Sequence, residues 1–95
     1  YRQILYLESR LHQVIVHTVR PQDVCDFAAV LDDVVKVLPE ETFFRCHQSF
    51  LVNIDSIYQL DRTGRNLILS NGETLGISKR YYKDVHRIFP WEATL

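Results

Sequence analysis

The chain has 95 residues, of which 46% are apolar and 24% are charged. This composition is typical of one folded domain and excludes a disordered chain. No apolar run approaches the roughly 18 residues of a membrane span, no secretory leader begins the sequence, and two cysteines are too few for a disulfide framework. We therefore expect a single cytoplasmic domain over residues 1–95.

The net charge of −1 argues against a generally basic nucleic-acid-binding chain. The charge is unevenly distributed, however. Residues 1–44 hold four basic and seven acidic residues, whereas residues 45–95 hold seven basic and five acidic residues. A local basic face is enough for phosphate contact, so the second half of the chain permits a nucleic-acid partner.

The first elements in chain order are two strands rich in β-branched and aromatic residues, at 4–8 and 13–19, joined by the polar connection 9–12. Residues 21–23 have turn chemistry, and residues 24–27 can form a third short strand. Apolar residues then recur at spacings of three and four from Phe27 to Leu38. This pattern predicts an amphipathic helix that Pro39 ends.

The second half of the chain continues with strands at 42–46 and 50–54, separated by a polar break. Two more strands, at 56–61 and 65–70, join through Gly64, and Asn71-Gly72 predicts a hairpin turn into residues 73–77. Ser78 can cap a helix that begins at Lys79 and stops at Pro90. The predicted fold class is mainly β with two short helices.

A catalytic or metal centre is not indicated. Cys46 and His47 are adjacent, so on a strand their side chains point to opposite faces and cannot form a thiolate–imidazole pair. We interpret Cys25 and Cys46 as core residues. The histidines lack the close spacing of metal ligands, and the three glycines are isolated. We expect no enzyme activity, no metal and no cofactor, and a structural role for His17.

Polar residues of the types that read base edges gather in three connections, at residues 10–13, 47–49 and 78–80. The last of these also lies at a helix N-terminus, which favours phosphate oxygens. Polar loop residues are usually only solvated, so this pattern permits DNA binding without establishing it. A non-catalytic protein-interaction β module that uses the acidic N-terminal half is the alternative.

Four segments in order and at matching spacing resemble the LytTR family of DNA-binding domains. They are "QILYLES", "FFRCHQSFLVNIDSI", the Asn-Gly turn and "ISKRYYKDVHRIF". The most specific part is "FFRCHQSFLVN", which is similar to the family pattern Phe-x-Arg-x-His-x-Ser-aromatic-apolar-Val-Asn. The segments "FFRCH" and "LHQVIVH" look closest to the regulators of peptide quorum sensing in Gram-positive bacteria.

This resemblance implies an elongated domain of stacked β-sheets that inserts loops into successive major grooves of double-stranded DNA. It implies that His12, Gln48 and Arg80 contact bases. Gln48 stands where many members of the family have Arg or Asn, which leaves its base preference open. The loop before His12 is also shorter than in the most similar relatives. Asn53 is expected to bond to nearby backbone.

Further DNA contacts and partners are expected around these three residues. Arg62 and Arg65 form a hairpin tip that either touches DNA or is only solvated. The implied partners are promoter DNA with paired repeats, a second copy of the domain on that DNA, and an N-terminal receiver domain in the full-length protein. The residues expected to contact the DNA backbone are Arg10, Gln13, Arg45, His47, Ser49, Ser78, Lys79 and Lys83.

Overall fold

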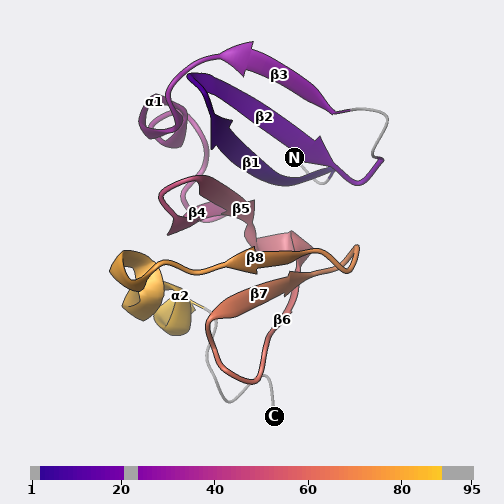
Figure 1. Cartoon of the computed structure of the whole chain (residues 1–95), viewed down its shortest axis with the longest axis vertical. Helices are drawn as coiled ribbons and strands as arrows, with labels where there is room; N and C mark the ends of the chain where they lie inside the picture. Colours follow the sequence, from indigo (N-terminus) through magenta and orange to yellow (C-terminus); the bar gives the residue numbers. More distant parts are fainter. Residues whose placement is uncertain (1–2, 21–23, 89–95) are drawn as a thin grey trace.

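Two antiparallel sheets organise the computed structural model, which describes residues 3–20 and 24–88 (Figure 1). The first sheet has five strands in the order β3-β2-β1-β5-β4, and the second has three in the order β6-β7-β8. The strands are β1 (Ile4–Arg10), β2 (Gln13–Thr18), β3 (Cys25–Ala28), β4 (Phe43–His47), β5 (Phe50–Asn53), β6 (Ile57–Leu60), β7 (Asn66–Leu69) and β8 (Thr74–Gly76).

Four short helical segments complete the fold. Their bounds are α1 (Leu31–Val35), η2 (Ile54–Ser56), η3 (Lys79–Tyr81) and α2 (Tyr82–Ile88). The 3₁₀ turn η2 joins the two sheets, and η3 runs directly into α2. The mainly β fold with two short α-helices, expected from the sequence, is confirmed. The domain is also elongated, with extents of 38 × 27 × 22 Å.

The five-stranded sheet is buried on both faces at β5, although its edge strand β3 is exposed. Leu51 and Val52 are consecutive residues of β5 that point to opposite faces, yet both are almost fully buried. Leu51 belongs to a cluster with Leu31 and Val34 of α1, and Val52 belongs to a second cluster with Leu67 of β7. One face therefore packs against α1, and the other packs against the second sheet and α2.

Polar side chains fix η2, the connection between the two sheets, to β1 of the first sheet. Asn53 is 1% exposed; its Nδ2 donates to the Ile4 carbonyl (2.9 Å) and its Oδ1 accepts from the Asp55 amide (2.9 Å). The hydroxyl of Ser56, also buried, lies 2.9 Å from the Leu5 carbonyl. The expected backbone-bonding role of Asn53 is confirmed.

The β6–β7 and β7–β8 turns are each built around a glycine. Gly64 and Gly72 have positive φ values of 71° and 92°, as the predicted turns require. The β1–β2 hairpin instead turns through Leu11 (φ 48°) and His12 (φ 65°), because Arg10 pairs with Gln13 and leaves two residues for the turn. These two are the only non-glycine residues with positive φ in the described ranges.

Two predictions in the 24–38 segment are wrong. The helix covers only Leu31–Val35, because Phe27 lies in β3 and pairs with Val14 of β2. Cys25 is exposed rather than buried, because β3 is the edge strand of the sheet and no helix covers it. The third strand itself is confirmed, and Cys46 is fully buried as expected.

At the other end of the chain, Ser78 occupies the N-cap position without a side-chain capping bond, and the first turn of the helix is 3₁₀. The predicted turn at residues 21–23 and the predicted helix stop at Pro90 lie outside the described residues. Within residues 3–20 and 24–88, no helix is long and apolar enough to span a membrane.

Candidate nucleic-acid interface

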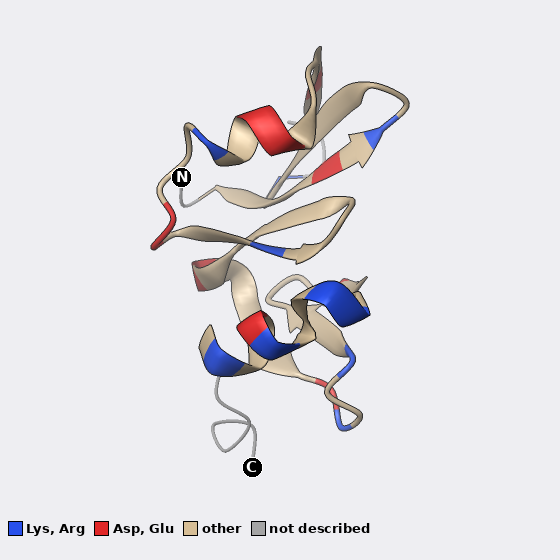
Figure 2. Cartoon of the chain, turned by 90° about the vertical axis from the view of Figure 1, so that its left-hand side faces the viewer, with Lys and Arg blue, Asp and Glu red and all other residues tan. Residues whose placement is uncertain are grey.

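Three connections rich in polar side chains lie on one side of the molecule. They are the β1–β2 turn, the β4–β5 turn and η3, found on the left in Figure 1 and on the right in Figure 2. The side chains of His12, Gln48 and Arg80 are exposed, one on each connection. Gln48 and Arg80 also line one concavity of about 370 Å³, whereas His12 stands apart on the upper hairpin.

The β4–β5 turn consists of Gln48 and Ser49, since His47 pairs with Phe50. The carbonyl of Ser49 accepts from the Ser9 amide of β1 (2.9 Å), and the amide of Ser49 donates to Nδ1 of His47 (3.0 Å). Because a main-chain amide only donates, Nδ1 accepts, and the neutral His47 ring carries its proton on Nε2. The His47 ring also packs against Phe50.

Arg45 supports the same turn from β4. Its Nη2 donates to the Gln48 carbonyl (2.6 Å), its Nε to the His47 carbonyl (3.2 Å), and its Nη1 to Oδ1 of Asp32 on α1 (2.7 Å). The Arg45 side chain is only 17% exposed. The hydrogen bond from Arg45 lowers the pKa of the Asp32 carboxyl below its usual range.

Polar and aromatic contacts between β1 and β2 lie next to the β1–β2 turn. Glu8 bonds to Arg10 (3.1 Å) and to His17 (2.9 Å), and the His17 ring stacks on Tyr6 with centroids 4.3 Å apart. The Tyr6 hydroxyl donates to Glu73 of the second sheet (2.9 Å), and burial is the first cause of its raised pKa. The structural role expected for His17 is confirmed.

The start of the last helix is fixed to β4. The Ser78 amide donates to the Cys46 carbonyl (3.0 Å), which anchors η3 against the edge of the five-stranded sheet. The Arg80 guanidinium lies 5.5 Å from the centroid of the Tyr81 ring. Lys79 and Lys83 are exposed on the same helical segment.

The structure also assigns a place to Arg65, which the sequence left as either a contact or a solvated tip. Arg65 lines one depression with Lys79 and Lys83, so three cations from β6–β7 and from η3–α2 gather there. Figure 2 shows basic segments along this side and acidic segments on α1. Of the other expected phosphate contacts, Arg10 and Gln13 are exposed, and His47, Ser49 and Ser78 are half-buried.

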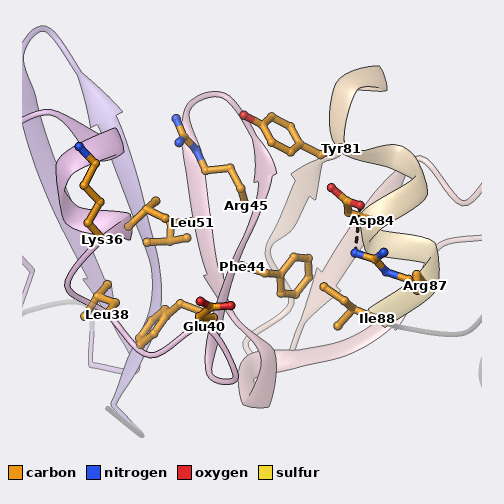
Figure 3. A pocket seen from close by; sticks show the side chains of 12 residues that line it. Lys36, Leu38, Glu40, Phe44, Arg45, Leu51, Tyr81, Asp84, Arg87 and Ile88 are labelled. Carbon is orange, nitrogen blue, oxygen red and sulfur yellow. Dashed lines mark hydrogen bonds and ion pairs between the residues drawn. The ribbon is translucent and has the colours of Figure 1, made fainter.

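A separate groove of about 520 Å³ runs between α1 and α2 over β4 (Figure 3). Apolar side chains such as Phe44, Leu51 and Ile88 line it, and the Asp84–Arg87 ion pair lies at its α2 wall (3.2 Å). Figure 3 shows Arg45 and Tyr81 side by side at one end, where the groove meets the polar side of the molecule.

Cys46, in the segment that precedes the β4–β5 turn, is a buried thiol. Burial raises the pKa of the Cys46 thiol to about 12, so it is not a thiolate at neutral pH. No cluster of three or more His, Cys, Asp or Glu side chains suited to a metal ion occurs in the part of the chain that the structure describes.

Polar turns and several cations gather on one side of this β domain, which suits contact with a polyanion such as a nucleic acid. The chain belongs to the LytTR family, because the family model described as the LytTr DNA-binding domain matches residues 1–89.

Relatives agree with this assignment. The chain is 32% identical over 87 residues to the accessory gene regulator protein A of Staphylococcus epidermidis, and 32% identical over 88 residues to the sensory transduction protein LytT of Bacillus anthracis. Each match covers 90% of this chain and 35% of the relative, so the chain spans about a third of these proteins. A solved LytTr DNA-binding domain from Bacillus cereus superposes with a TM-score of 0.78 at 26% identity, covering 90% of this chain and 80% of that one.

Proposed function

We propose that this chain is the output domain of a bacterial response regulator of transcription, and that it binds specific double-stranded DNA without catalysing a reaction. His12, Gln48 and Arg80 read bases in successive major grooves. The observation that carries the proposal is their arrangement: three exposed residues of base-reading type lie one on each of three connections, and these connections are on one side of the molecule.

The size of the domain fits this mode of binding. The long axis of 38 Å is close to one turn of B-DNA, about 34–36 Å, so turns on the two sheets can reach neighbouring grooves. Arg10, Gln13, His47, Ser49, Ser78, Lys79 and Lys83 contact the DNA backbone in this proposal, and Arg65 joins them. The Nε2 proton of His47 is a suitable donor to a phosphate oxygen.

The first test begins with selection of a preferred site from a pool of random-sequence duplexes. The selected duplex and a scrambled duplex are then titrated over a salt series. His12→Ala and Arg80→Ala are each expected to lose about 1–3 kcal/mol of discrimination at one base pair. Lys83→Ala is expected to weaken both duplexes equally and to lower the salt slope by about one.

Asp26→Ala on β3 is the control, because this residue lies on the far edge strand and not on the three turns. Its binding curves are expected to match those of the unmodified domain. Affinity without salt dependence, or loss of binding on changing Asp26, would contradict the proposal and favour the protein-interaction module.

The wider assembly belongs to the same proposal. A receiver domain precedes this domain in the full-length cytoplasmic protein, and two copies of the domain occupy paired promoter repeats. A footprint on DNA with two selected sites about one helical turn apart is expected to cover both sites, whereas protection of one site alone would contradict paired binding.

A further inference from the structure

Arg45 carries a positive charge close to the proposed interface, yet its guanidinium is already bonded to other groups of the protein. Three of its nitrogens donate to the His47 carbonyl, the Gln48 carbonyl and the Asp32 carboxylate, at 3.2, 2.6 and 2.7 Å. The planar fork of arginine suits such simultaneous bonds, and lysine cannot reproduce them. With its side chain 17% exposed and its charge paired, Arg45 is poorly placed to clamp a phosphate.

The bonds of Arg45 complete the support of the β4–β5 turn. The carbonyls of His47 and Gln48 accept from Arg45, and the carbonyl of Ser49 accepts from Ser9. Three consecutive carbonyls are therefore held from two different strands. The side chain of Gln48 is the exposed part of an otherwise fixed turn.

Asp32 is the counter-ion that orients this arginine. Its side chain is 74% exposed, and it lines the same concavity as Gln48 and Arg80. A carboxylate on a DNA-facing surface repels phosphate, so it weakens general attraction to DNA. Asp32 nevertheless has a positive role, because its bond to Nη1 of Arg45 fixes the plane of the guanidinium.

Tyr81 connects this arrangement to the last helix. The Arg45 guanidinium lies 6.0 Å from the centroid of the Tyr81 ring, and that of Arg80 lies 5.5 Å from the same centroid. The two cations thus share one aromatic ring, which links the turn that carries Gln48 to the start of the helix that carries Arg80.

We propose that Arg45 is a positioning residue: held by Asp32, it fixes the β4–β5 turn and its spacing to η3, and so sets base discrimination by Gln48 rather than contacting the DNA phosphates. This inference rests on the proposed DNA-binding function. Arg45 thereby contributes to discrimination between base pairs, whereas Lys79 and Lys83 contribute to the overall affinity for DNA.

The test compares Arg45→Lys with Lys83→Ala on the selected and the scrambled duplex over a salt series. In Arg45→Lys, the ratio of the two affinities is expected to fall about tenfold or more, because discrimination is lost at the base pair that Gln48 contacts. The salt slope is expected to stay unchanged. Lys83→Ala is the matched control, which is expected to keep the ratio and lower the slope. An unchanged ratio for Arg45→Lys, or a lowered slope with equal weakening of both duplexes, would overturn the positioning role.

Asp32→Asn provides a second variant with little effect on shape. It is expected to tighten binding to the scrambled duplex, because a repelling charge is removed, while the ratio of the affinities falls. Discrimination that is unchanged or improved in this variant would contradict the role of Asp32. Circular dichroism and urea unfolding of each variant establish that the domain is folded.

A double-mutant cycle separates positioning from a general structural effect. Once Gln48→Ala has removed the reading side chain, adding Arg45→Lys is expected to cost little further discrimination, whereas additive losses would overturn the coupling. The unmodified domain is the control for the proposed function itself. If the unmodified domain fails to discriminate between the duplexes, the DNA-binding proposal fails. If the unmodified domain discriminates and Arg45→Lys discriminates equally well, only the positioning role fails.

Discussion

Leu11 and His12 adopt a left-handed backbone conformation that costs most L-amino acids about 1–2 kcal/mol each. Leu11 is 89% exposed, so its side chain recovers little of this cost by packing. A two-residue hairpin turn of this kind normally uses Asn-Gly. Strain of this kind is often found at functional sites, and here it falls on the turn that carries the exposed His12.

This strain can be relieved at Leu11, which is not one of the proposed base contacts. Leu11→Asn is expected to raise the free energy of unfolding by about 0.5–1 kcal/mol, because asparagine tolerates the left-handed region. Urea denaturation measures the change. Leu11→Ala is the matched control, since it removes the same side chain but keeps the backbone cost; an equal gain in both variants would show that strain is not the cause.

Single residues also show where sequence patterns reach their limit. The "RCHQS" segment pointed to Gln48 as the exposed tip, because apolar residues flank it on both sides. The same segment predicts that Arg45 contacts the DNA backbone, and only the three-dimensional structure shows that its charge is paired with Asp32, thirteen residues away. An ion pair between residues so far apart in the sequence cannot be recognised from the spacing of residues within one segment.

At the scale of elements, the helix predicted from Phe27 to Leu38 shows how two periodic patterns overlap. Phe27 fits a helical stripe with Val30 and Val34, but it also alternates with Asp26 and Ala28 as an edge strand does. Pairing with β2 decides between them, and this pairing is a tertiary effect. The β7–β8 hairpin, by contrast, could be predicted correctly from the sequence, because the Asn-Gly pair determines its turn locally.

The β6–β7 connection offers a prediction at this scale. Asp61 accepts from the Thr63 hydroxyl, the Arg65 amide and Asn66 Nδ2, and the bond from Asn66 is the first cause of its lowered pKa. Because the folded-state pKa lies below the ordinary value of 3.8, the stabilisation is present at neutral pH and is lost as the pH falls below that value.

Asp61→Asn is therefore expected to be less stable than the unmodified domain at pH 7, and the two stabilities are expected to converge in strong acid. Thermal unfolding followed from pH 7 down to about 2.5 measures the difference. Asp33→Asn on α1, an exposed carboxylate in an i,i+3 ion pair, is the control. A difference that stays constant with pH would rule out the carboxylate as its source.

For the whole molecule, stability depends on how the two sheets are joined. Asn53 and Ser56 lie at the junction, and their bonds to the Ile4 and Leu5 carbonyls tie η2 to β1 across nearly fifty residues of sequence. Truncation of Asn53, which is 1% exposed, would remove the side-chain partner of the Ile4 carbonyl and of the Asp55 amide and would leave a gap in the packed junction.

Asn53→Ala is accordingly expected to lower the free energy of unfolding by about 2–3 kcal/mol. Gln3→Ala, the exposed amide residue just before β1, is expected to change it by less than about 0.5 kcal/mol. Urea denaturation followed by near-ultraviolet dichroism and by far-ultraviolet dichroism measures both variants. A loss for Asn53→Ala no larger than that for Gln3→Ala would contradict its role in the junction.

The bonds that hold the β4–β5 turn end on main-chain carbonyls, which every amino acid supplies. Arg45 and Ser9 therefore support the turn whatever side chain stands at position 48. In the proposed mode of DNA binding, the residue at this position can be exchanged without loss of its support, and descendants of one domain would acquire new operator sequences one substitution at a time. Retargeting and folding are separable in this scaffold.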